Sequence, residues 1–153
     1  YGAGDEKIGS IVGGTSADGK EVKRKFLDNT PALKSLRERV ATASKRGYLV
    51  GLDGRRIWVR SEHSALNTLL QGAGAIVMKK ALTLLDVKAR VYNCKYKIVG
   101  NIHDEIQTEV LDMDAQSFGR LAVDSIIQAG KDFNLNCPLD GDYKIGETWN
   151  ETH

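Results

Sequence analysis

The 153-residue sequence is poor in the residues that build disulfide frameworks, metal clusters or membrane spans. Its two cysteines, Cys94 and Cys137, fit no metal-binding spacing, so we expect two reduced thiols. No apolar run approaches the roughly 20 residues that a membrane helix requires, and we expect no membrane partner. The first six residues lack the basic and apolar stretches of a secretory signal peptide, so a cytoplasmic location is expected.

Two further features are missing at the start of the chain. Gly2-Ala3-Gly4 has no preceding strand and lacks the third glycine of a dinucleotide-binding fingerprint, which excludes that interpretation. There is no initiator methionine, which suggests a fragment or a processed product. Hydrophobic residues at 41% and charged residues at 27% are typical of a globular protein.

Charge is unevenly distributed, although the net charge is only +2. Residues 1–62 hold 13 Lys and Arg against 8 Asp and Glu, whereas residues 101–153 hold 3 against 11. A basic front part suits a polyanion, and an acidic back part suits metal ions. Ordinary solvated faces would explain both distributions equally well.

The pattern of apolar residues predicts an α+β fold in which helices precede and follow antiparallel strands. Thr30-Pro31 combines a capping hydroxyl with a proline at the first helical position, and Asp53-Gly54 is typical of a tight hairpin turn. Helices are expected at about 5–12, 18–28 (with Lys23, Arg24 and Lys25 exposed), 31–47, 61–85 and, capped by Asp112, 114–129. Strands are expected at about 48–59, 91–110 and 139–145.

The most distinctive polar segment is His103-Asp104-Glu105, between two apolar strand segments. Ionised carboxylates cannot be buried unpaired, so this trio belongs at a hairpin tip. Carboxylate oxygens there could bind a hard cation such as Mg²⁺. A solvated acidic turn remains the alternative.

Two further groups of side chains could contact nucleic acid. Arg55 and Arg56 follow the predicted turn and could reach phosphates. A polar stripe on the helix after Ser61 lies within about 80° of arc, which suggests close approach of a ligand, although a solvated face would look the same. Its members are His63, Asn67, Gln71 and Gly74.

Together these segments resemble family A DNA polymerases. Their sequences are most similar to those of the replicative polymerases of podovirus-type phages. The resemblance follows the family's order over nearly the whole chain. Its segments are Tyr1–Gly9 (the end of the fingers helix), Leu52–Arg56 (the following hairpin), Arg60–Gln71 (a helix that contacts duplex DNA) and Ile102–Gln107 (the C motif).

The resemblance implies a fragment of a right-hand polymerase, with a helical fingers portion at 1–60 and antiparallel palm strands at 61–153 that carry the C-motif hairpin. It implies that Asp104 and Glu105 are catalytic and bind Mg²⁺ in a two-metal site, with Asp104 the more critical. The primer–template contacts that it implies are Tyr1 near the templating base, the adjacent Gly2, Arg55 and Arg56 in the hairpin, His63, Asn67 and Gln71 on the minor-groove side, and His103 beside the primer terminus. Many relatives have arginine where this chain has His63.

The resemblance also implies that essential groups lie outside these residues. The family's first catalytic aspartate lies on a palm strand that precedes the fingers. The arginine, lysine and aromatic residue that hold the triphosphate lie earlier on the fingers helix, so all of these groups would precede Tyr1. We therefore expect a DNA-directed DNA polymerase that binds primer–template DNA and dNTP and is inactive without an upstream polymerase fragment. Such a piece could also self-associate. A DNA-binding remnant without catalysis, and more remotely a metal-dependent nuclease, are the alternatives.

Overall fold

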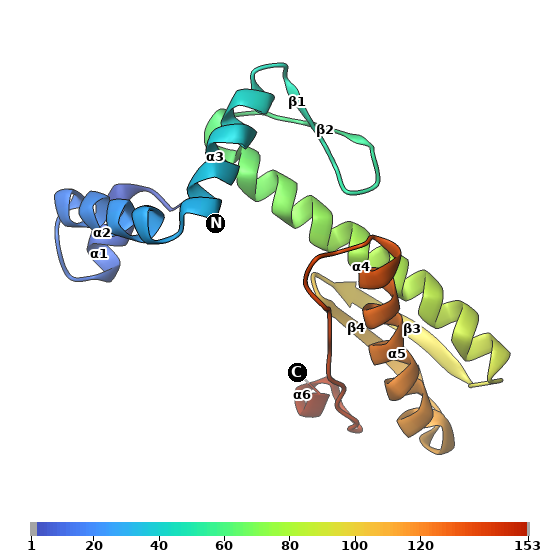
Figure 1. The fold of residues 1–153 in the computed structure, drawn as a ribbon. Coiled ribbons are helices and arrows are strands. Elements are labelled where there is room, and N and C mark those ends of the chain that lie inside the picture. Colours follow the sequence, from blue (N-terminus) through green and yellow to red (C-terminus); the bar gives the residue numbers. More distant parts are fainter. Residues whose placement is uncertain (1–2, 153) are drawn as a thin grey trace. The chain divides into compact units, whose positions relative to one another are not determined.

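The computed structural model describes residues 3–152, which form helices and two small antiparallel sheets (Figure 1). The predicted α+β composition is therefore confirmed. Within these residues, none of the helices has the length and apolar character that crossing a bilayer would require. The elements are α1 (Asp5–Ile11), α2 (Ser16–Asn29), α3 (Pro31–Ser44), β1 (Tyr48–Val50), β2 (Arg56–Trp58), η1 (Glu62–Ser64), α4 (Ala65–Val91), β3 (Tyr96–Ile102), β4 (Glu105–Val110), α5 (Asp112–Asp132) and α6 (Trp149–Thr152).

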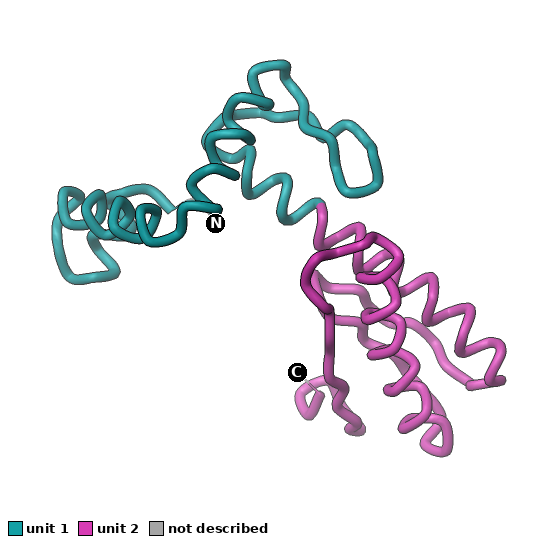
Figure 2. Tube along the Cα trace, viewed as in Figure 1, with its two compact units in different colours: residues 1–72 teal, residues 73–153 magenta. Residues whose placement is uncertain are grey.

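The chain divides into two compact units, residues 1–72 and 73–153, coloured teal and magenta in Figure 2. The boundary lies within α4. The division into a fingers portion at 1–60 and a palm portion at 61–153 stays a prediction, because compactness does not reveal which residues work together.

In the first unit, α1 and α2 pack closely because glycines stand where they meet. A Cβ atom added to Gly19 would lie 1.9 Å from the carbonyl oxygen of Asp5, and one added to Gly9 would lie 2.0 Å from that of Thr15. Thr15 also begins α2 with a capping box, in which its side chain accepts from the Asp18 backbone N–H and the Asp18 carboxylate accepts from Thr15 N. Lys23, expected to be exposed, is half-buried because it donates to Asp5 Oδ1 at 3.0 Å.

The β1–β2 hairpin is fixed to α3 and the start of α4 by a small apolar core. Leu49 is buried with Val40 and Ala65, and Ile57 packs against them. The predicted turn is confirmed: Gly54 has φ of +81°, a conformation that glycine adopts without strain, and its N–H donates to Gly51 O. Strand pairing therefore sends alternate residues either to this core or to the opposite face.

The second unit has its own core beneath the β3–β4 sheet. Leu85, Ala89, Cys94 and Phe118 are buried together, joined by half-buried residues from both strands and from α5. The antiparallel register pairs Ile102 with Glu105, which leaves His103 and Asp104 in the turn. The predicted hairpin tip is thus confirmed.

Three local predictions are wrong. Thr30 does not cap α3, because its hydroxyl donates instead to the Phe26 carbonyl of the preceding helix. Asp112 is the first residue of α5, after Leu111 at the capping position, and makes no cap hydrogen bond. Residues 139–145 form no strand, because their side chains pack on α5: a Cβ on Gly119 would lie 2.3 Å from the Tyr143 ring, and Tyr143 donates to Gln116.

Candidate nucleic-acid and metal site

The two carboxylates at the acidic tip of the β3–β4 hairpin differ in their surroundings: one is exposed to solvent and the other is fixed by a hydrogen bond. Asp104 is exposed, whereas Glu105 is half-buried and accepts a hydrogen bond from the Gln107 side-chain amide. His103 takes φ of +55°, the left-handed conformation that this tight turn requires. This Gln107 contact was not predicted from the sequence, although the i+2 spacing of Gln107 from Glu105 puts both side chains on one face of the strand.

These side chains fit part of a Mg²⁺ site. Carboxylate oxygens are the ligands that this hard cation prefers, and sites with one or two protein carboxylates are common. Among residues 3–152, no three His, Cys, Asp or Glu side chains converge so as to hold a metal ion. The tip therefore offers a partial ligand set whose completion needs further oxygen ligands.

The predicted polar stripe begins one turn before α4. Ser61 accepts a hydrogen bond from Ser64 N, which starts the short helix η1 that carries an exposed His63. Asn67 is half-buried and Gln71 is exposed, both on the first turns of α4. The side-chain oxygen of Asn67 is buried without a hydrogen-bond partner among the described residues. A buried acceptor without a partner costs about 1–3 kcal/mol.

The two predicted arginines of the hairpin differ in their partners. Arg55 donates to Asp53 Oδ2 at 2.6 Å, so its charge is partly neutralised within the loop. Arg56 instead lies over the Tyr48 ring, with its Cζ atom 4.8 Å from the ring centroid. Because Arg56 lies over an uncharged ring whereas Arg55 pairs with a carboxylate, Arg56 is more available to bind a phosphate.

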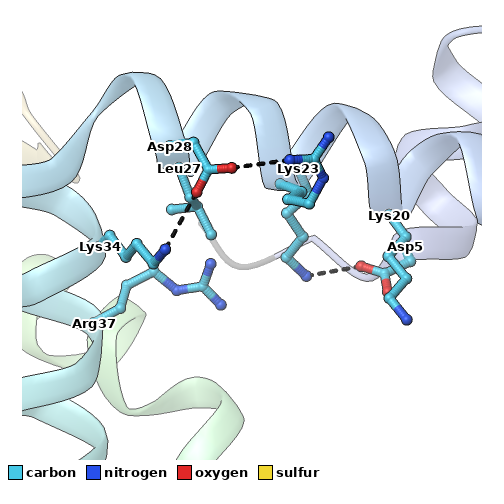
Figure 3. Close-up of a pocket in the computed structure, with 8 residues that line it drawn as sticks. Asp5, Lys20, Lys23, Leu27, Asp28, Lys34 and Arg37 are labelled. Atoms are coloured by element: carbon cyan, nitrogen blue, oxygen red, sulfur yellow. Dashed lines mark hydrogen bonds and ion pairs between the residues drawn. The ribbon is translucent and has the colours of Figure 1, made fainter.

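Five cations line a pocket of about 300 Å³ between α2 and α3, which the sequence analysis missed (Figure 3). Asp28 pairs with Arg24 at 3.1 Å and with Lys34 at 3.2 Å, and Asp5 pairs with Lys23. Much of the charge is thus balanced internally. The lining residues are Asp5, Lys20, Lys23, Arg24, Leu27, Asp28, Lys34 and Arg37.

The structure gathers the predicted residues into two separate groups. Arg55, Arg56, His63, Asn67 and Gln71 belong to the first unit, whereas His103, Asp104 and Glu105 belong to the second. Tyr1 and Gly2, both predicted to bind DNA, fall outside the described residues. Their roles and those of the other residues stay predictions.

Comparison with known proteins identifies the class. Residues 1–151 match DNA polymerase family A. The chain is 39% identical to a DNA-directed DNA polymerase of Escherichia phage Phieco32 over 160 residues, covering 100% of this chain and 26% of that protein. It is also 39% identical to the DNA-directed DNA polymerase of Escherichia phage T7 over 175 residues, covering 100% of this chain and 25% of that protein.

More distant relatives agree. DNA polymerase I of Geobacillus stearothermophilus is 27% identical, over 97% of this chain and 18% of that protein. The fold resembles the solved POL domain of Pol1 from M. smegmatis, in complex with DNA primer-template and dNTP, with a TM-score of 0.73. That likeness covers 82% of this chain and 24% of the other at 20% identity.

The chain belongs to DNA polymerase family A. It spans about a quarter of the length of the phage relatives that it matches. The expected resemblance to phage and bacterial polymerases is confirmed, and the fold is that of part of a polymerase domain.

Proposed function

We propose that these residues form part of a DNA-directed DNA polymerase in which Asp104 and Glu105 bind Mg²⁺ for nucleotidyl transfer. The observation that carries the proposal is the exposed Asp104 carboxylate at the tip of a β-hairpin, in a chain of this family. Hydrogen bonding from Gln107 supports the role of Glu105 by fixing one of its oxygens.

In the proposed reaction, the primer 3′-oxygen bonds to the α-phosphorus of dNTP and the bond to pyrophosphate breaks. Bound Mg²⁺ ions would supply activation of the hydroxyl and neutralisation of the phosphate charge. Asp104 would provide exposed oxygen ligands, and Glu105 would support them from its fixed position. His103, exposed in the same turn, would contact the primer terminus.

The polar stripe would hold the primer–template by its minor groove. Every base pair offers acceptors there, so contacts of this kind can check pairing without selecting a sequence. Gln71 and His63 are exposed and able to donate to these acceptors.

The partial ligand set supports a dependence on a further segment. Two adjacent carboxylates do not by themselves position two metal ions, and the chain spans about a quarter of its phage relatives. We propose that residues 1–153 alone do not extend a primer, and that an aspartate and triphosphate-binding cations from a preceding segment complete the site.

Primer extension tests this proposal. Residues 1–153 would replace the matching segment of the Phieco32 polymerase, and this joined polymerase would be compared with the 153-residue chain alone. The proposal predicts extension by the joined polymerase only, with Mg²⁺ and all four nucleotides. Extension by the chain alone would contradict the need for a further carboxylate. A joined polymerase that melts cooperatively and binds primer–template but extends nothing would favour the DNA-binding remnant.

A further inference from the structure

The β1–β2 hairpin has an outer face, defined here as Tyr48, Val50, Arg56 and Trp58 of the strands together with two flanking residues, Arg46 before β1 and the exposed Arg60 after β2. Strand pairing matches Tyr48 with Trp58, Leu49 with Ile57 and Val50 with Arg56. Leu49 and Ile57 point to the core, so the other two pairs point away from it. Trp58 is 69% exposed and Val50 is 51% exposed, which shows that no described residue covers this face.

Aromatic rings and arginines are interleaved on the outer face. The Tyr48 and Trp58 rings meet edge-on, with centroids 5.9 Å apart and an interplanar angle of 67°. The guanidinium groups of Arg46 and Arg56 lie over the Tyr48 ring, 4.7 and 4.8 Å from its centroid. These contacts hold Tyr48 and both arginines in place while the broad Trp58 ring faces solvent.

The outer face is also uniformly positive. Among the described residues, no carboxylate forms an ion pair with Arg46, Arg56 or Arg60, and the nearby Asp53 is held by Arg55 in the loop. An exposed indole among unneutralised arginines fits a ligand that is both flat and anionic. Unpaired nucleotides have this chemistry, because each joins a base that can stack to a phosphate.

We propose that the outer face binds single-stranded DNA by stacking an unpaired base on Trp58, with Arg46, Arg56 and Arg60 near the flanking phosphates. Duplex DNA could not make the stacking contact with Trp58, because its bases are stacked on one another and their ring faces are not accessible. An acidic peptide would match the arginines but leave the indole in water. The inference rests on the proposed polymerase function in one respect only: that function identifies the bound single strand as unpaired template.

Binding of oligothymidylate to the 153-residue chain, measured by fluorescence anisotropy, tests the stacking contact. Trp58→Leu should weaken binding by about 5- to 100-fold, the usual value of one base–aromatic stack, and Trp58→Phe should restore most of it. Trp149→Leu, which removes the other exposed tryptophan of the described chain, should change little. Circular dichroism melting of each variant ensures that folded proteins are compared.

Two further probes separate stacking from charge. An oligomer of equal length whose sugar-phosphate chain carries no bases should bind wild type and Trp58→Leu equally. Trp58→Leu should leave the salt dependence unchanged, whereas Arg56→Gln should reduce the slope of log K against log salt by about 0.7 for one phosphate contact.

Several results would overturn the inference. They are unchanged thymidylate binding by folded Trp58→Leu, an equal loss for the base-free oligomer, or polyglutamate binding that depends on Trp58 to the same degree. Asp104→Ala keeps the two proposals distinct. It should abolish extension by the joined polymerase yet leave thymidylate binding intact, so either proposal can fail while the other stands.

Discussion

At the scale of single residues, close backbone contacts explain why particular glycines stand where they do. Gly19 meets the Asp5 carbonyl at a distance that no Cβ atom tolerates, whereas Gly4 has nothing within 4 Å of an added Cβ. The sequence predicted two front helices, at about 5–12 and 18–28. It could not show which glycine lies in a helix contact, because that depends on how two segments meet in space.

The Gly19→Ala variant should therefore be destabilised. Separating α1 from α2 should cost about 1–3 kcal/mol, as overpacking usually does, despite the better helix propensity of alanine. Urea unfolding followed by circular dichroism measures this, with Gly4→Ala as the matched control that should change little. An unaltered midpoint for Gly19→Ala would mean that α1 and α2 do not meet at this glycine.

Tyr96 and Asp86 should give stability a defined pH dependence. The Tyr96 hydroxyl donates to Asp86 Oδ1 at 2.5 Å, and this bond lowers the pKa of Asp86. Burial first, and then the same bond, raise the pKa of Tyr96. The stability that Asp86 contributes is present at pH values above the ordinary aspartate pKa of about 4, and it is lost as the pH falls further. The stability that Tyr96 contributes is present below the ordinary tyrosine pKa of about 10, and it is lost as the pH rises above that value.

The Tyr96→Phe variant should consequently lose most stability relative to wild type between about pH 4 and 10, and the difference should narrow outside that range. Urea unfolding at pH 3, 7 and 11 measures it. A difference that stays constant across all three values would show that the hydroxyl contributes no titrating interaction.

At the scale of elements, local sequence identified most helices and hairpins but misassigned their ends. The Thr30-Pro31 pair does begin α3, yet the Thr30 side chain forms no cap hydrogen bond there. A threonine cap is present at the start of α2, where Thr15 accepts from the Asp18 N–H. Residues 139–145 have strand-like composition, but Tyr143 and Leu139 pack against Gly119 and Gly130 of α5. Their apolar character serves helix packing, and only the position of α5 could reveal this.

Substituting Thr15 and Thr30 by alanine should distinguish the threonine that makes a cap hydrogen bond from the one that does not. Thr15→Ala should cost about 1 kcal/mol, because it leaves the Asp18 N–H without its acceptor. Thr30→Ala should cost less, because the Phe26 carbonyl that it releases can be satisfied by water. Chemical unfolding of both variants supplies the comparison, and a larger loss for Thr30→Ala would reverse the assignment.

At the scale of the whole molecule, the sequence predicted the family and the acidic hairpin tip but not the outer face of the β1–β2 hairpin. The acidic trio is contiguous, so its place between two strands is evident from the pattern. Tyr48 and Trp58 are ten positions apart and become neighbours only when the strands pair. The proposed Mg²⁺ site likewise depends on groups that residues 3–152 do not bring together.

The uneven charge of the chain should govern how it binds DNA. Residues 1–62 carry 13 Lys and Arg against 8 Asp and Glu, so released counterions should make affinity fall steeply with salt. Anisotropy titrations of a primer–template at several salt concentrations should give a linear log–log plot with a negative slope. Affinity that does not change with salt would exclude phosphate contacts as its main source.

The proposed catalytic role of Asp104 is tested most directly by the single-turnover rate of nucleotide incorporation in the joined polymerase. Asp104→Ala should lower that rate by about 10³-fold or more while primer–template affinity stays within a few-fold, since the carboxylate serves the metal rather than the DNA. The matched control is Glu109→Ala, which removes an exposed acid of the adjoining strand β4 away from the tip and should keep the rate. An Asp104→Ala enzyme that incorporates nucleotide at the rate of the control would contradict the account.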